Sequence, residues 1–142
     1  TRSMPRLSRY MVRASLVHLA TGFLIGGLML AHKAVPLYPT IPFLLGWHVH
    51  ALLFGWTVQL AFGVAYWIFP RLSSWGFAHP RGYPELAWAA LLFINGGVLL
   101  AGPGGLIGGT PAMALGTFLE VLGVVAFGLH LLPRLRPPLP GG

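Results

Sequence analysis

The sequence predicts an all-α protein that forms a four-helix transmembrane bundle. Of its 142 residues, 56% are hydrophobic and 8% are charged, whereas about a quarter of the residues of a soluble domain carry a charge. The apolar residues form four runs long enough to cross a bilayer, separated by proline- and glycine-rich segments. The basic residues cluster at the ends of these runs, which is typical of membrane topology and not of nucleic-acid binding.

The expected elements follow from these runs in chain order. Residues 1–13 interleave arginines with apolar residues and predict a basic lead-in at the membrane surface. A single four-span membrane domain is expected over residues 14–132, and a flexible tail over residues 133–142. The spans are expected at about residues 12–31, 43–69, 85–101 and 112–132, with an uncharged glycine-rich turn at residues 102–111.

Small and polar residues indicate where the spans pack against one another. Gly22 and Gly26 form a G-x-x-x-G pattern in the first span, which permits close helix contact. Asn95, near the centre of the short third span, predicts an interhelical hydrogen bond. Glu120 lies near the middle of the fourth span, where an ionised carboxylate is costly. We therefore expect it to be protonated and hydrogen-bonded, or to lie beside a polar group such as Gln59 or Asn95.

The basic residues also predict an orientation. The N-terminal segment carries four of them, and the second loop and the tail carry two each, whereas Lys33 stands alone on the opposite side. This asymmetry predicts cytoplasmic N- and C-termini. We expect the protein in the inner (plasma) membrane of a prokaryote. The chain contains no cysteine, which excludes disulfides, thiolate metal sites and covalently attached haem.

The prediction of function comes from the second span, which contains several polar residues but no charged one. His48 and Gln59 are eleven residues apart, about three helical turns, and therefore fall on one face. Small residues on that face would let a flat, bulky group or another helix come close. The residues of this face are His48, Gly55, Gln59, Gly63 and Tyr66.

Histidines within the spans are the candidate ligands. Neutral imidazoles in an apolar bundle can bind haem iron, copper or zinc. Haem fits best, because the glycines make room for a porphyrin. His48 and His50 lie about 200° apart on an ideal helix, so an undistorted helix turns only one of them toward a given metal. We favour His48, because it shares the face of Gly55 and Gln59.

Depth in the membrane decides which histidines can share one iron. His48 and His50 lie near the outer end of the second span and His130 near the inner end of the fourth, roughly 20 Å apart in height. His18 lies on the inner side of the first span, so His18 and His130 form the expected intrachain pair. An outer haem needs His32, the same histidine of a second copy, or an open coordination position. A homodimer is therefore expected.

The second span also carries a pattern found in a known family, made of His48, His50, Phe54, Gly55, Trp56, Gln59, Gly63 and the run from Tyr66 to Arg71. This pattern resembles a histidine-bearing helix of the haem–copper oxidase subunit I superfamily, to which the large subunit of nitric oxide reductase belongs. The resemblance implies an axial haem b ligand at His48 or, alternatively, at His50. Complete subunits have more spans and a copper site built from three further histidines, so we do not expect this chain to be a complete oxidase or reductase.

The sequence therefore predicts a membrane haem b protein that transfers electrons or binds a small gas such as O2 or NO. Its expected partners are the lipid bilayer, a second copy of the chain, and a redox partner protein or quinone. Two alternatives stay open. One is a cofactor-free assembly or scaffold protein whose histidines are packing residues, and the other is a copper-binding module that uses His32, His48 and His50 on the outer side.

Overall fold

The computed structural model describes residues 3–69 and 81–135, and within these ranges all regular structure is helical. The first span is one continuous helix, whereas the second is assembled from four short helical segments in sequence. The segments are α1 (Arg6–Ala34), η1 (Ile41–Leu44), α2 (Leu45–His50), η2 (Ala51–Val58), α3 (Gln59–Ile68), α4 (Pro84–Ala101) and α5 (Pro103–Leu135).

Four helical stretches are long and apolar enough to cross a membrane: Arg6–Ala34, Ile41–Ile68, Pro84–Ala101 and Pro103–Leu135. Their outward faces carry large apolar side chains. Phe23, Leu30 and Leu92, for example, are 64%, 70% and 69% exposed. Helices satisfy their backbone hydrogen bonds internally, as a bilayer requires. The predicted all-α fold with four spans is thus confirmed, and it indicates an integral membrane protein.

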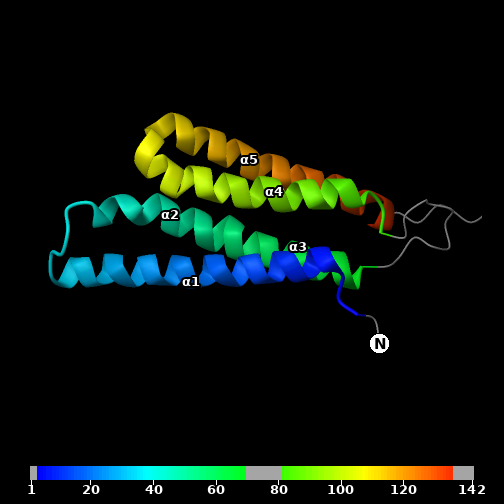
Figure 1. The fold of residues 1–142 in the computed structure, drawn as a ribbon, viewed down its shortest axis with the longest axis horizontal. Coiled ribbons are helices and arrows are strands. Elements are labelled where there is room, and N and C mark those ends of the chain that lie inside the picture. Colours follow the sequence, from blue (N-terminus) through cyan, green and yellow to red (C-terminus); the bar gives the residue numbers. More distant parts are fainter. Residues whose placement is uncertain (1–2, 70–80, 136–142) are drawn as a thin grey trace, which may run out of the picture.

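The helices form two antiparallel hairpins that lie side by side (Figure 1). The first hairpin pairs α1 with the second span, and the second hairpin pairs α4 with α5. The start of α1 and the end of α5 lie together at one end of the bundle, which we call the terminal end. The chain reverses within each hairpin at the opposite end, which we call the turn end.

Glycines bring the backbones together within each hairpin. In the second hairpin, a Cβ atom on Gly97 would lie 2.6 Å from the carbonyl oxygen of Gly116, and the reverse distance is the same. In the first hairpin, a Cβ atom on Gly22 would lie 2.5 Å from a methyl carbon of Leu52. Lipid provides no hydrophobic drive for helix association, so close packing at these glycines contributes to holding each hairpin together.

The largest apolar cluster lies at the terminal end and draws on all four spans. The stacked rings of Phe62 and Phe127, 4.1 Å apart between centroids, join α3 to α5 there. The cluster consists of Leu7, Met11, Tyr66, Ala87, Ala90, Ala126 and Phe127. This core therefore ties the two hairpins together at the terminal end.

Two boundaries expected from the sequence differ from those of the structure: the start of the first span and the turn at residues 102–111. Helix α1 begins at Arg6, so residues of the expected surface lead-in form its first turns, and Leu7 and Met11 are buried in the core. The expected glycine-rich turn is largely helical, because the chain reverses at Gly102 and leaves helical geometry again only at Gly109. Gly109 has a φ of 65°, which favours glycine. The part of the expected tail beyond Leu135 lies outside the described residues.

Candidate functional site

His48 lies on α2 and turns toward α1, where two glycines leave room for its ring. Its Nδ1 atom lies 2.7 Å from the carbonyl oxygen of Gly22, and a Cβ atom on Gly26 would lie 2.7 Å from its Cε1 atom. A carbonyl oxygen only accepts hydrogen bonds, so Nδ1 carries the proton and donates it. In the neutral ring the lone pair then resides on Nε2. Metal-bound histidines are commonly held in the same way, by a hydrogen bond from the other ring nitrogen.

Beside His48, a groove with a volume of about 500 Å³ opens on the outer face of the first hairpin. Apart from His48, its walls come from α1: Phe23, Gly26, Gly27, Met29, Leu30 and Lys33. The volume falls within the range typical of cofactor sites. A Cβ atom on Gly27 would meet nothing within 4 Å, so this part of the floor is open. We call this feature the His48 groove.

His50 turns away from α1 and joins the two hairpins. Its Nδ1 atom lies 2.9 Å from both carboxylate oxygens of Glu120 on α5. Glu120 is completely buried, and a buried carboxylate is tolerated when it is paired. The sequence predicted that Glu120 is protonated and hydrogen-bonded, or lies beside a polar group such as Gln59 or Asn95. The polar group beside it is His50, whereas Gln59 and Asn95 bond to each other.

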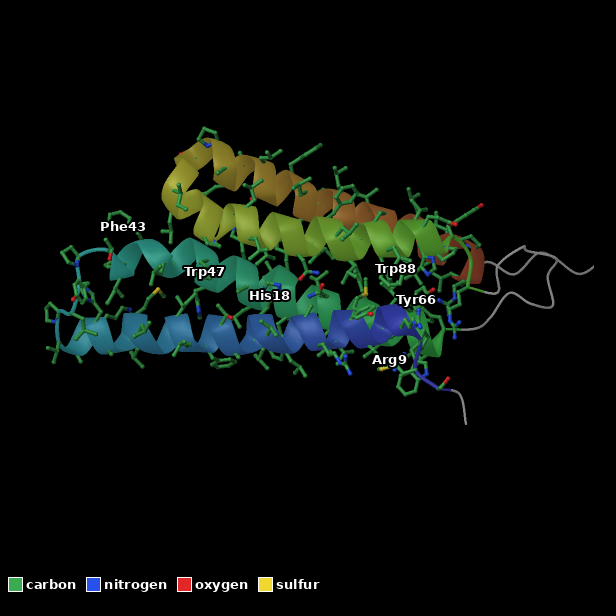
Figure 2. The ribbon with its side chains drawn as sticks, viewed as in Figure 1. Arg9, His18, Phe43, Trp47, Tyr66 and Trp88 are labelled. Carbon is green, nitrogen blue, oxygen red and sulfur yellow. The ribbon has the colours of Figure 1, made fainter. Side chains whose placement is uncertain are left out.

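A second polar link between the hairpins consists of His18, Gln59 and Asn95, which we call the Asn95 cluster. The Nε2 atom of His18 lies 2.9 Å from Asn95 Oδ1, and Asn95 Nδ2 donates to Gln59 Oε1 at 2.5 Å. Gln59 Nε2 donates back to Asn95 Oδ1 at 3.3 Å and also to the carbonyl oxygen of Gly55. His18 lies between α1 and the second span (Figure 2). The interhelical hydrogen bond expected for Asn95 is confirmed, and its partner is Gln59.

His130 is fully buried at the terminal end. Its Nδ1 atom lies 2.9 Å from the carbonyl oxygen of Tyr83, and its ring stacks on Tyr66 with 5.2 Å between centroids. Its Nε2 atom has no hydrogen-bond partner among the described residues. Arg134, one turn further on α5, donates to the carbonyl oxygens of Tyr66 and Phe69. His130 therefore packs as an aromatic core residue.

The structure does not bring together His18 and His130, the expected intrachain pair. His18 covers Gly55, whose Cβ atom would lie 2.5 Å from its Cγ atom, whereas His130 stacks on Tyr66. Gly55 and Tyr66 are eleven residues apart along the same span, which corresponds to about 16 Å. Two ligands of one iron must lie on either side of a single atom, so His18 and His130 are too far apart to bind the same haem.

The three histidines of the copper alternative also diverge. His48 bonds to α1 and His50 to α5, whereas His32 accepts a hydrogen bond from the backbone N–H of Leu37. Within residues 3–69 and 81–135, no three His, Asp or Glu side chains form a group that could hold a metal ion.

The expected face of small residues turns into the bundle, but protein side chains fill its space. Gly55, Gln59, Gly63 and Tyr66 are all buried. The ring of His18 covers Gly55, and the side chain of Met11 covers Gly63. A porphyrin has no room there. The open space lies beside His48, where the glycines belong to the first span. The sequence analysis used Gly26 only as a helix contact and Lys33 only to predict the orientation, and it gave Gly27 no role.

Comparison with known proteins identifies no relative from which a function could be transferred. No family model, curated protein or solved structure matches this chain. The resemblance of the second span to a subunit I helix therefore stays a prediction.

Proposed function

We propose that this integral membrane protein binds haem b through His48 in the His48 groove. One observation carries the proposal: the hydrogen bond from Nδ1 to Gly22 leaves the Nε2 lone pair available beside a groove of about 500 Å³. The imidazole of histidine is a common ligand of haem iron. Bound there, haem would supply a redox-active iron suited to electron transfer or to binding O2 or NO.

The surrounding residues fit a flat, largely apolar group with one anionic edge. Gly26 and Gly27 keep side chains out of the groove floor, and Phe23 and Leu30 provide apolar walls. Lys33 is the cation of the lining, and its ammonium group can pair with the carboxylates at the edge of a haem. The carbonyl oxygen of Gly22 holds the imidazole in one orientation, which limits the motion of its free nitrogen.

The groove opens on the outer face of the first hairpin, so its second side is free for another ligand. From that side a small gas, or the His48 of a second copy, could reach a haem held by the first His48. A homodimer of the latter kind would cover the exposed wall of α1. With cytoplasmic termini, the groove lies in the outer half of the plasma membrane, where a quinone or a redox protein can exchange electrons with it.

Absorption spectroscopy of the purified protein tests this proposal. We expect a Soret band that His48→Ala abolishes, and that added imidazole restores in His48→Gly. Gly27→Leu should also abolish it by filling the groove. Gly128→Leu is the matched control, because Gly128 is exposed on α5 and its Cβ atom would likewise meet nothing within 4 Å. Carbon monoxide should shift the reduced spectrum of a five-coordinate haem and leave a bis-histidine haem unchanged.

The remaining histidines support a second candidate, a cofactor-free scaffold. His18, His50 and His130 are all engaged in hydrogen bonds that hold helices together. If the protein expressed with sufficient haem is colourless, or if His48→Ala keeps the Soret band of the wild type, haem binding at His48 is refuted. A colourless protein that carries copper in elemental analysis would instead support the copper module.

A further inference from the structure

A cleft between the two hairpins adjoins a basic pocket at the terminal end. The cleft has a volume of about 610 Å³ and lies between α1 and α4, with Val17, Leu91 and Leu92 among its walls. The basic pocket has a volume of about 280 Å³ and is lined by Arg6, Arg9, Tyr10 and Arg13. Tyr10 and Arg13 line both, so the two cavities meet at these side chains.

Among the residues that the structure describes, no acidic side chain pairs with the arginines of the basic pocket. Arg6, Arg9 and Arg13 are exposed on the first turns of α1, and the first turn contains no acidic residue. Cations at a helix N-terminus also face the positive end of the helix dipole. The whole chain has two acidic residues, and Glu120 is held by His50. An external anion would therefore stabilise this end of the helix.

Aromatic side chains place the basic pocket at the level of lipid headgroups. The rings of Tyr10 on α1 and Trp88 on α4 lie 5.9 Å apart beside the pocket. Trp and Tyr are enriched where a membrane protein meets the bilayer surface. Figure 2 shows Arg9 and Trp88 near the terminal end of the bundle. A group bound by these arginines would thus lie in the headgroup region.

The inner part of the cleft offers no free polar group to a ligand. Asn95 lies at its base, but both N–H groups of its amide donate, to Gln59 and to the carbonyl oxygen of Leu91. Its Oδ1 atom accepts from both His18 and Gln59, so its hydrogen-bonding capacity is used up. The cleft therefore suits hydrocarbon, and it disfavours the polar head of a quinone.

We propose that the cleft and the basic pocket together bind one phospholipid with an anionic headgroup. Its phosphate pairs with Arg9 and Arg13, since guanidinium groups match phosphate geometry. One acyl chain lies along the apolar cleft, where Gly96 leaves space between α1 and α4. A partner helix in the same cleft would bury the apolar walls but would leave the arginines without an anion. This proposal is independent of haem binding.

Native mass spectrometry of the delipidated full chain tests the proposal, with dioleoyl phosphatidylglycerol and dioleoyl phosphatidylcholine as probes. We expect one phosphatidylglycerol to bind about tenfold more tightly than phosphatidylcholine, since each arginine near a membrane surface contributes measurably to anionic lipid binding. The double variant Arg9→Gln/Arg13→Gln should lose this preference. Lys33→Gln, which removes one charge at the turn end of the same helix, should keep it.

A separate variant tests whether the cleft binds an acyl chain. Gly96→Leu fills the cleft without a clash, because a Cβ atom on Gly96 would meet nothing within 4 Å. It should weaken binding of both lipids at least fivefold, whereas Gly128→Leu should not. Retained preference in the double arginine variant, or unchanged binding in Gly96→Leu, overturns the proposal. Competition by inorganic phosphate at lipid-like concentrations also overturns it, because the pocket would then be a free-phosphate site.

Discussion

Replacing Asn95 by leucine tests whether polar contacts hold the two hairpins together. The change keeps a side chain branched at Cγ but removes three hydrogen bonds between the hairpins, one with His18 and two with Gln59. Interhelical hydrogen bonds in membranes average about 0.6 kcal/mol each, which gives a loss of about 2 kcal/mol. The buried amide of Gln59 would keep only its bond to Gly55, and this increases the loss.

The assay is unfolding by sodium dodecyl sulfate in mixed micelles, followed by circular dichroism. Leu99→Ala serves as the control, because Leu99 lies on the same helix and is 55% exposed. In a double-mutant cycle, Asn95→Leu and Gln59→Leu together should cost less than the two single changes added, since they break the same bonds. An Asn95→Leu variant as stable as the wild type would refute the view that the Asn95 cluster joins the hairpins.

Two further changes probe other contacts with the same unfolding assay. Gly116→Val should destabilise the second hairpin by about 1–3 kcal/mol, because the added side chain is overpacked against Gly97. Gly128→Val should be nearly neutral, because a Cβ atom there meets nothing within 4 Å. Equal stability of the two variants would contradict this packing. Glu120→Gln should lower the free energy of unfolding by less than about 1 kcal/mol, because the amide oxygen can still accept the bond from His50. Glu120→Leu leaves the N–H of His50 unpaired and should lower it by about 1–3 kcal/mol. Similar losses for both would show that the pair contributes little.

The number and position of the spans could be predicted because hydropathy is a property of the sequence alone. The second span, expected at residues 43–69, is observed at Ile41–Ile68. The start of the first span was harder to place. Arginines among the first residues indicated a surface segment, but Leu7 and Met11 join a core whose other members come from α3, α4 and α5. Only the assembled bundle reveals that contact.

The partners of the polar residues depend on how the spans are aligned with one another, which one sequence does not contain. The face that includes Gly55 and Gln59 was predicted, but not that His18 would fill the space over Gly55. The second span also leaves α-helical geometry at Ala51–Val58, where a π-helical segment changes the rotation of the residues that follow. His48 and His50 point to different helices, as their spacing predicted.

The division into two hairpins has a consequence for biosynthesis. The ribosome completes the first hairpin before it has made Asn95 or Glu120, so His18, His50 and Gln59 enter the bilayer without the partners they have in the finished protein. Polar groups left in hydrocarbon are costly, and the arrival of α4 and α5 removes that cost. A nascent chain truncated after the second span would leave these groups without the partners that α4 and α5 supply.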